Sequence, residues 1–212
     1  PLLIGRRQDG LNPGNTSGLA RTLTGSGPVQ WRHNGKSNGI ADLSGNVWEW
    51  NSGMRIFNGE IQVIADNNAS KLAINLGAAS TEWKAIDGET GNLVTPDGSG
   101  TTVGTIKYAD GGTADYTISG GSFGAIRNLS TTKPVTAAAL ARLKALCLHP
   151  HTGNTASYNS DYFGKFMKGE TLPIRGGYWT DAANAGVFAL YLGLARSSTI
   201  AHIGARPAFV NL

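Results

Sequence analysis

A single stretch of this chain has the clear pattern of an α-helix, and this limits what the chain can fold into. Leu140, Leu143 and Cys147 recur at helical spacing within AAALARLKALCL. Thr136 can cap this helix and Pro150 can end it. Cys147 lies among the apolar residues of the helix, so we expect it to be a buried thiol. Glycine supplies 30 of the 212 residues and interrupts the remaining sequence, which is typical of turns between short strands. We therefore expect an α+β fold with short strands, one or two helices and much ordered loop.

Short strands are predicted on both sides of the helix. The clearest signal is a hairpin in residues 53–64, GMRIFNGEIQVI, where apolar residues flank an Asn-Gly pair suited to a type I′ turn. Other candidates are residues 82–86, 101–108 and 115–118, and short pieces from residue 174 onward; a second, short helix could lie near residues 17–23. We interpret residues 1–212 as one domain, in which residues 53–130 could be an inserted β-rich subregion, because no linker separates two domains.

Charge and hydropathy exclude several classes of partner. The net charge is +4, and the basic residues are scattered rather than clustered, so no nucleic-acid partner is expected. No apolar stretch approaches the roughly 20 residues that cross a bilayer, so no membrane insertion is expected. The chain starts at Pro1 without an initiator methionine or a signal peptide, and we interpret it as a carboxy-terminal piece of a longer protein or as a processed protein.

The residues offer little support for catalysis, and we expect that the chain is not an enzyme. Gly120–Gly124 has a serine among glycines but lacks the G-x-S-x-G spacing of a nucleophile elbow. His149 and His151 lack a third ligand at metal-binding spacing, and Cys147 is the only cysteine. No Ser–His–Asp or Cys–His arrangement follows from the spacing.

Four motifs resemble one known family. Residues 42–50, DLSGNVWEW, resemble the GNVWEW signature of the formylglycine-generating-enzyme and sulfatase-modifying family, and Trp48 and Trp50 of this motif would be core residues. Residues 174–179, IRGGYW, look like the R-G-G-x-W strand of that family, and residues 195–196 and 203–206 look like its closing elements. The resemblance implies a C-type lectin fold. It does not imply the activity, because the oxidising members use a pair of cysteines and the ergothioneine-forming members use histidines from another domain.

The same resemblance implies a structural calcium ion, the only cofactor that we consider. In the family, the segment that matches DLSGNVWEW holds calcium through two side chains and two carbonyls. The matching positions here are Asp42, Gly45, Val47 and Glu49, and oxygen ligands suit calcium. The alternative is that Asp42 and Glu49 only form hydrogen bonds in a tight turn.

A narrower resemblance covers residues 174–206. This region is similar to the variable region of proteins diversified by retroelements, which include phage tropism determinants at tail tips. The fixed positions of that pattern are Arg175, Gly176, Gly177, Trp179, Gly186, Val187, Phe188, Leu190, Leu192, Ala195, Arg196, Ile203, Gly204 and Arg206. The variable positions, which would bind the ligand, are Tyr178, Thr180, Asp181, Tyr191, Gly193, Leu194, Ser198, Ile200, Ala201 and His202. Ala205 departs from the pattern, which has Phe there.

Codon chemistry agrees with these variable positions, although it tests them weakly. An AAC codon whose adenines are randomised cannot encode Trp, Glu, Lys, Gln or Met. None of these residues occupies a proposed variable position, but all five types are uncommon in the chain.

Strand geometry predicts where the variable side chains point. On one strand Phe188, Leu190 and Leu192 would face the core, which leaves Tyr191 toward solvent. On another strand Trp179 would point inward and Tyr178 outward. Residues 200–202 would lie on a loop before a strand at residues 203–209. We expect the variable side chains to converge on one patch, with the two tyrosines as its anchors.

These patterns predict a binding function. We expect a phage tail-tip or fibre module that recognises a protein or glycan on the host surface and is located in the virion. The alternatives are a diversified binding protein displayed on a prokaryotic cell surface or outside the cell, and, less favoured, a formylglycine-generating-like oxidoreductase. The resemblance to tail-tip proteins is compatible with a homotrimer.

Overall fold

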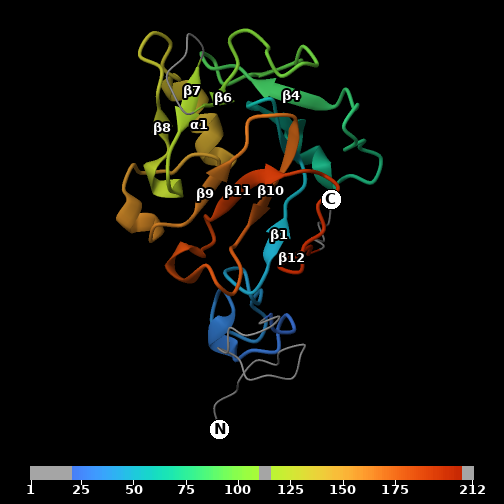
Figure 1. Cartoon of the computed structure of the whole chain (residues 1–212), viewed down its shortest axis with the longest axis vertical. Coiled ribbons are helices and arrows are strands. Elements are labelled where there is room, and N and C mark those ends of the chain that lie inside the picture. Colours follow the sequence, from blue (N-terminus) through green and yellow to red (C-terminus); the bar gives the residue numbers. More distant parts are fainter. Residues whose placement is uncertain (1–20, 110–115, 207–212) are drawn as a thin grey trace.

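The computed structural model describes residues 21–109 and 116–206 (Figure 1). They form an α+β fold in which most regular structure belongs to short strands of an open sheet. Among the described residues there is one α-helix, α1 (Ala137–Ala145), with several short 3₁₀ turns. Residues 17–20 of the second expected helix lie outside the described residues, and residues 21–23 are not helical.

Strand β10 (Glu170–Arg175) is the centre of the sheet. Its first half pairs antiparallel with β2 (Met54–Phe57), and its second half pairs antiparallel with β1 (Trp48–Trp50). Strand β11 (Leu190–Leu194) also pairs antiparallel with β10. Two parallel neighbours extend this centre: β12 (Ile203–Gly204) lies beside β1, and β9 (Phe163–Lys165) lies beside β11. Segments far apart in the sequence therefore meet around β10.

The predicted hairpin is confirmed. It joins β2 to β3 (Glu60–Ile64), and both turn residues have positive φ, 48° at Asn58 and 88° at Gly59, as a type I′ turn requires. The sheet branches at β3: one arm runs through β4 (Trp83–Ile86) to β5 (Leu93–Val94), and the other runs through β6 (Lys107–Tyr108) and β7 (Thr117–Ser119) to β8 (Arg127–Asn128). The strand prediction for residues 82–86 is thus confirmed.

Residues 101–108 are mostly loop, so that strand prediction is wrong except at Lys107 and Tyr108. The cause is a local turn. The Asp97 carboxylate accepts hydrogen bonds from the backbone N–H groups of Ser99, Gly100 and Thr101. Such bonds satisfy the backbone without a partner strand.

Helix α1 begins as predicted and ends earlier than predicted. The Thr136 hydroxyl accepts from the Ala139 N–H at 3.4 Å. The end is a Schellman motif, in which the N–H groups of Cys147 and Leu148 donate to the carbonyls of Lys144 and Leu143. Cys147 takes the left-handed position of this motif, with φ of 54°. It is exposed, so the prediction of a buried helical thiol is wrong, and Pro150 does not end the helix.

The two faces of the β10–β11 pair carry different apolar clusters. One face contributes Leu190 and Leu192 to the main core, which also contains residues of β2, β3, β7 and α1. Residues 53–130 therefore share one core with the carboxy-terminal strands. The opposite face carries a smaller cluster built on Trp48, Ile174 and Ala189.

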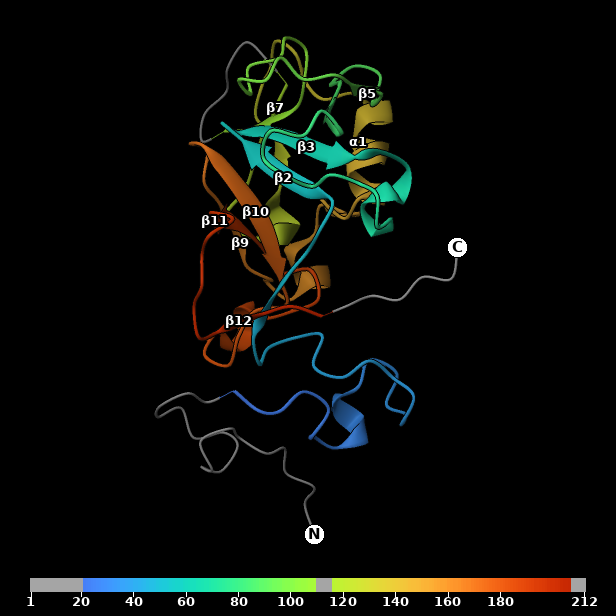
Figure 2. The same ribbon diagram turned by 90° about the vertical axis from the view of Figure 1, so that its right-hand side faces the viewer.

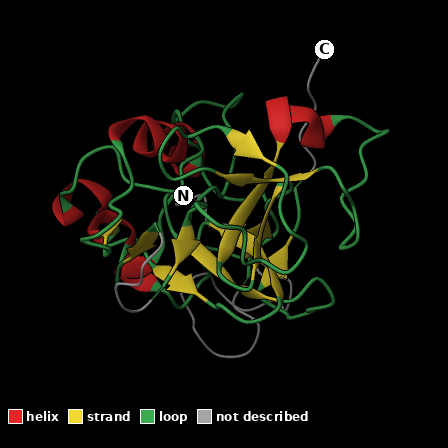
Figure 3. Ribbon diagram, turned by 90° about the horizontal axis from the view of Figure 1, so that it is seen from above, coloured by secondary structure: helices red, strands yellow, loops and turns green. Residues whose placement is uncertain are grey.

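The figures show how the elements are arranged along the molecule, with β1, β10 and β11 in its middle part (Figure 1). In Figure 2, strands β2 and β3 and helix α1 lie at the end opposite to the loop segment that precedes β1. Viewed from above, the strands occupy the centre and the helical turns surround them (Figure 3).

Candidate ligand-binding site

The smaller cluster forms the floor of a pocket of about 390 Å³. We call it the tyrosine pocket; it is lined by Trp48, Tyr162, Ile174, Tyr178, Asp181, Tyr191, Leu194, Ile200 and His202. Six of the ten proposed variable positions are in this set. Trp48 and Ile174 are only 5% and 2% exposed, so the floor belongs to the scaffold and the walls come mainly from the proposed variable positions.

A double-glycine turn brings Tyr178 to the pocket. Gly176 and Gly177 follow β10 with φ of 97° and 79°, which favour glycine. A Cβ atom on Gly177 would lie 2.7 Å from the Cβ of Ala185, so a larger residue does not fit there. The Tyr178 N–H then donates to the Asp181 carboxylate at 2.8 Å. This hydrogen bond closes the turn that places Tyr178 in the wall of the tyrosine pocket.

The turn changes the predicted orientation of two aromatic residues. The sequence predicts that Tyr178 and Trp179 lie on a strand with their side chains on opposite faces. Both instead lie beyond β10, and both are half-buried. Tyr178 packs against the Trp48 cluster. Trp179 packs edge-on against Tyr178 and His202, with ring centroids 5.3 and 6.2 Å away. The prediction that Trp179 points inward and Tyr178 outward is therefore wrong, because the glycine turn ends the strand alternation.

Tyr178 and His202 form the opening of the pocket. Their rings are stacked, with centroids 4.4 Å apart and planes at 28°. His202 is held there because its carbonyl accepts from the Trp48 N–H at 2.9 Å, next to the parallel β1–β12 pairing. Burial raises the pKa of the neighbouring Asp181 carboxyl, although the hydrogen bond from the Tyr178 backbone acts in the opposite direction.

Tyr191 lines the opposite wall. Strand alternation places it across from Ile174 on the pocket face of β11, while Leu190 and Leu192 are fully buried on the other face. This was predicted for the two leucines. Tyr191 is half-buried rather than free in solvent, because its ring contacts Trp48 and Tyr162 at centroid distances of 6.4 and 6.0 Å.

Two residues important for the pocket were missed by the sequence analysis. Tyr162 precedes β9, and the parallel β9–β11 pairing brings it beside Tyr191. Asp161 is 4% exposed and accepts from the Phe188 N–H at 2.9 Å, which fixes the turn before β11. Burial raises the pKa of Asp161 despite its backbone hydrogen bonds. No local signal marked either residue, because β9 lies in a segment without strand periodicity.

The remaining proposed variable positions lie outside the lining of the pocket. Thr180 and Ala201 are exposed, and Ser198 is half-buried. Gly193 lies under the Tyr191 ring, and any Cβ atom there would collide with that ring. A substitution at Gly193 would therefore displace Tyr191, so these two positions are not independent.

The proposed fixed positions mostly hold the surrounding backbone. Phe188 stacks on Phe123 at 5.4 Å in the main core. Arg175 points to the other face and donates to the Cys147 carbonyl at 2.5 Å. Val187, in contrast, is 52% exposed and has no comparable packing role.

The segment proposed to hold calcium is organised by an arginine. Arg206 donates to the Glu49 carboxylate at 2.5 and 3.1 Å and to the Ala41 carbonyl at 2.7 Å. The Asp42 carboxylate instead accepts from the Gly25 N–H at 2.9 Å. The two carboxylates are thus engaged with different partners, and a guanidinium supplies the positive charge next to Glu49. This arrangement does not fit a calcium ion held by Asp42, Gly45, Val47 and Glu49 together.

No metal cluster is apparent elsewhere within residues 21–109 and 116–206, where no three His, Cys, Asp or Glu side chains are grouped to hold an ion. The pKa of His149 is lowered by burial, and its Nδ1 lies 2.9 Å from the Pro150 carbonyl. Calcium at residues 42–50 is therefore implied by the resemblance alone.

We expect Arg206→Gln to lower the free energy of unfolding by about 1–3 kcal/mol, because charge-assisted hydrogen bonds to Glu49 and Ala41 are lost. Urea denaturation measures this difference. The wild-type chain should give the same unfolding curve with calcium and with a chelator. A large stabilisation by calcium would contradict the role assigned to Arg206.

Among the described residues, no helix has both the length and the apolar character needed to cross a membrane. Comparison of the sequence with models of known protein families finds no match, and comparison with curated proteins finds no matching relative.

Proposed function

We propose that this chain is the receptor-binding module of a phage tail-tip or fibre protein, with a C-type lectin fold of the formylglycine-generating-enzyme type. Its ligand surface would be the tyrosine pocket, varied by a retroelement through the positions named above. It would recognise a protein or glycan on the host surface.

One observation carries this proposal: six proposed variable positions, from three short stretches of sequence at residues 178–181, 191–194 and 200–202, line a single pocket. They follow from the resemblance to the variable-region pattern, which carries no information on where they lie in this fold. Positions unrelated to a common surface would be expected on several faces of the molecule. Convergence on one concave surface is the property that a ligand site requires.

The surroundings of the pocket suit a surface whose side chains change. Its floor is held by strand pairing of β1, β10 and β11 and by buried Trp48 and Ile174. The wall residues are half-buried or exposed, and none belongs to the main core, although Tyr178, Tyr191 and Leu194 pack against the smaller cluster. Side chains placed on a rigid frame can therefore be exchanged while the backbone stays in place.

Tyr178 and Tyr191 would provide most of the binding energy, since tyrosine offers a large contact area with few rotatable bonds. Each would contribute about 1–4 kcal/mol by the usual hot-spot range. The alternative, a binding protein displayed on a prokaryotic cell surface, would use the same pocket. A homotrimer would present three copies of the pocket.

The DNA around the gene tests the diversification directly. We expect a near-copy of the codons for residues 175–206, with adenines at the proposed variable positions, close to a reverse-transcriptase gene. Tail or baseplate genes nearby would indicate a phage protein, and an upstream secretion signal would indicate a protein displayed on a cell surface. A locus with neither the near-copy nor the reverse transcriptase would refute retroelement diversification.

A further inference from the structure

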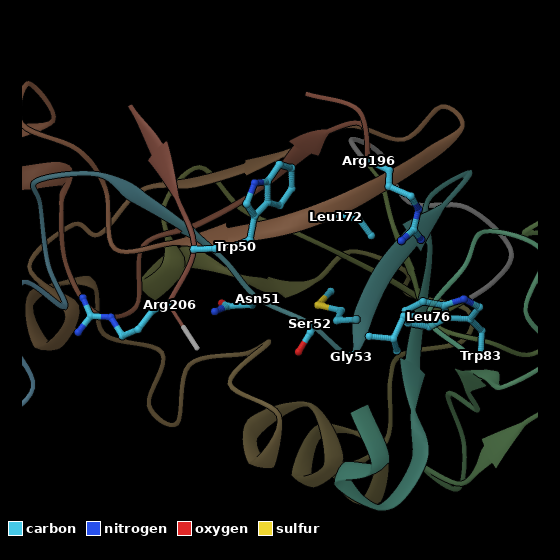
Figure 4. Close-up of a pocket in the computed structure, with 11 residues that line it drawn as sticks. Trp50, Asn51, Ser52, Gly53, Leu76, Trp83, Leu172, Arg196 and Arg206 are labelled. Atoms are coloured by element: carbon cyan, nitrogen blue, oxygen red, sulfur yellow. The ribbon is translucent and has the colours of Figure 1, made fainter. Parts of the chain in front are cut away.

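A second pocket lies on the same face of the sheet as the tyrosine pocket. We call it the arginine pocket; it has a volume of about 390 Å³ and is lined by Trp50, Asn51, Ser52, Gly53, Met54, Leu76, Trp83, Leu172, Arg196, Ala205 and Arg206. None of the proposed variable positions belongs to it. Figure 4 shows Trp50 on one side and Leu76 and Trp83 on the other, with Arg196 above Trp83.

The two pockets adjoin through the sheet. Trp48 and Trp50 are two residues apart on β1 and so face the same way, one toward each pocket. Leu172 of the arginine pocket pairs with Leu194 of the tyrosine pocket. Trp50 and Leu194 both pack against the Trp48 cluster. A single extended ligand can therefore reach both pockets.

The charged side chains that line the arginine pocket are Arg196 and Arg206, whereas their carboxylate partners Glu170 and Glu49 do not line it. Arg55 and Arg196 both pair with one carboxylate, Glu170, each at 2.9 Å. Burial alone would raise the pKa of Glu170, but hydrogen bonds from Arg196 and Arg55 hold it below its usual value. Glu170 is therefore ionised and shared by both guanidiniums, and Arg55 also has the Glu60 carboxylate as an electrostatic neighbour. The side chain of Arg196 is 39% exposed and remains accessible to an anion.

Other groups in the arginine pocket suit a polyhydroxylated ligand. Asn51 and Ser52 are exposed, and no hydrogen bond of either side chain is found within the described part of the chain. Trp50 offers a half-buried indole, and Leu172 and Met54 add apolar surface. Arg206 adds no free charge, because it is paired with Glu49 at 2.5 Å. Small-molecule sites have this composition: mostly apolar walls with a few oriented polar groups.

We propose that the arginine pocket is a constant subsite for an acidic sugar residue of a surface polysaccharide. The carboxylate would bind Arg196 through Nη1, because Nε and Nη2 donate to the two oxygens of Glu170 at 3.1 and 2.9 Å. The sugar hydroxyls would bind Asn51 and Ser52, and the ring would lie against Trp50. This inference rests on the proposed function: the constant subsite would hold a common sugar while the tyrosine pocket selects what is attached to it. The net charge of +4 would favour approach to an acidic polysaccharide.

Titration of the full chain with the methyl glycoside of glucuronic acid tests this subsite, with the Trp50 indole N–H followed by NMR. We expect saturable binding that is at least tenfold weaker for the neutral methyl glucoside and for acetate. Equal binding of the glucoside would overturn the role of Arg196. Equal binding of acetate would show a simple anion site and would overturn sugar recognition.

Substitutions locate the binding. Arg196→Gln should weaken glucuronide binding at least tenfold, and so should the double variant Asn51→Ala, Ser52→Ala, whose exposed side chains leave the fold intact. The matched control is Arg127→Gln, an exposed arginine on β8, which should bind as the wild type does. Unchanged binding in the double variant would refute the subsite. Because the probe is a monosaccharide, its failure would leave recognition through the tyrosine pocket untouched.

Discussion

Replacing Tyr178 and His202 together by alanine should reduce adsorption of the virion to its host about 100-fold. The two rings stack at 4.4 Å and form the opening of the tyrosine pocket, so they would be buried by any ligand that enters it. A loss of roughly 3 kcal/mol corresponds to about two factors of ten in affinity. Depletion of free virions from a suspension of host cells measures the adsorption rate.

The melting temperature should stay within a few degrees of the wild-type value in this double variant. Both side chains are only half-buried, and the backbone bond from Trp48 to the His202 carbonyl does not depend on the imidazole. We prefer this pair to Tyr178 with Tyr191, because the Tyr191 ring packs against Trp48 and Tyr162 and its loss would also disturb the scaffold.

A matched control is available in Phe166, which is 52% exposed and does not line the tyrosine pocket. Phe166→Ala removes a comparable aromatic ring and should leave adsorption unchanged. Normal adsorption by the Tyr178→Ala, His202→Ala variant would refute recognition through the tyrosine pocket. An equal loss with Phe166→Ala would show that the effect is not specific to this surface.

The sequence predicted those parts of the fold that depend on local chemistry. The Asn58-Gly59 turn requires two residues with positive φ, and the Thr136 cap needs only a hydroxyl at the start of α1. The burial of Leu190 and Leu192 follows from period-2 alternation within one strand. Each signal lies within a few residues of the structure that it specifies.

Features that depend on distant segments were not predictable. Tyr162 enters the pocket only because β9 pairs with β11. Arg206 takes up the Glu49 carboxylate across 157 positions of sequence. The directions of Tyr178 and Trp179 were wrong because Gly176 and Gly177 end the strand pattern, which alternation rules do not foresee. A resemblance indicates the variable positions, whereas the shape of the tyrosine pocket depends on pairing between distant strands.

Substitutions in the scaffold should lower the free energy of unfolding much more than substitutions at the variable positions. Trp48→Ala should lower it by about 3–5 kcal/mol, because a large buried side chain is removed and leaves a cavity. For a domain of this size, that corresponds to a fall in melting temperature of roughly 10 °C. Ile200→Ala, at a position that is 41% exposed, should change the free energy by less than about 0.5 kcal/mol.

Both side chains line the tyrosine pocket, so the comparison holds location constant while burial and side-chain size differ. Trp48 lies under the rings of Tyr162 and Tyr191, with centroid distances of 6.1 and 6.4 Å, and it supports the pocket from below. Urea denaturation of both variants gives the two free energies. A cost for Ile200→Ala as large as that for Trp48→Ala would mean that folding depends on the variable wall. Diversification of this surface would then be incompatible with a stable fold.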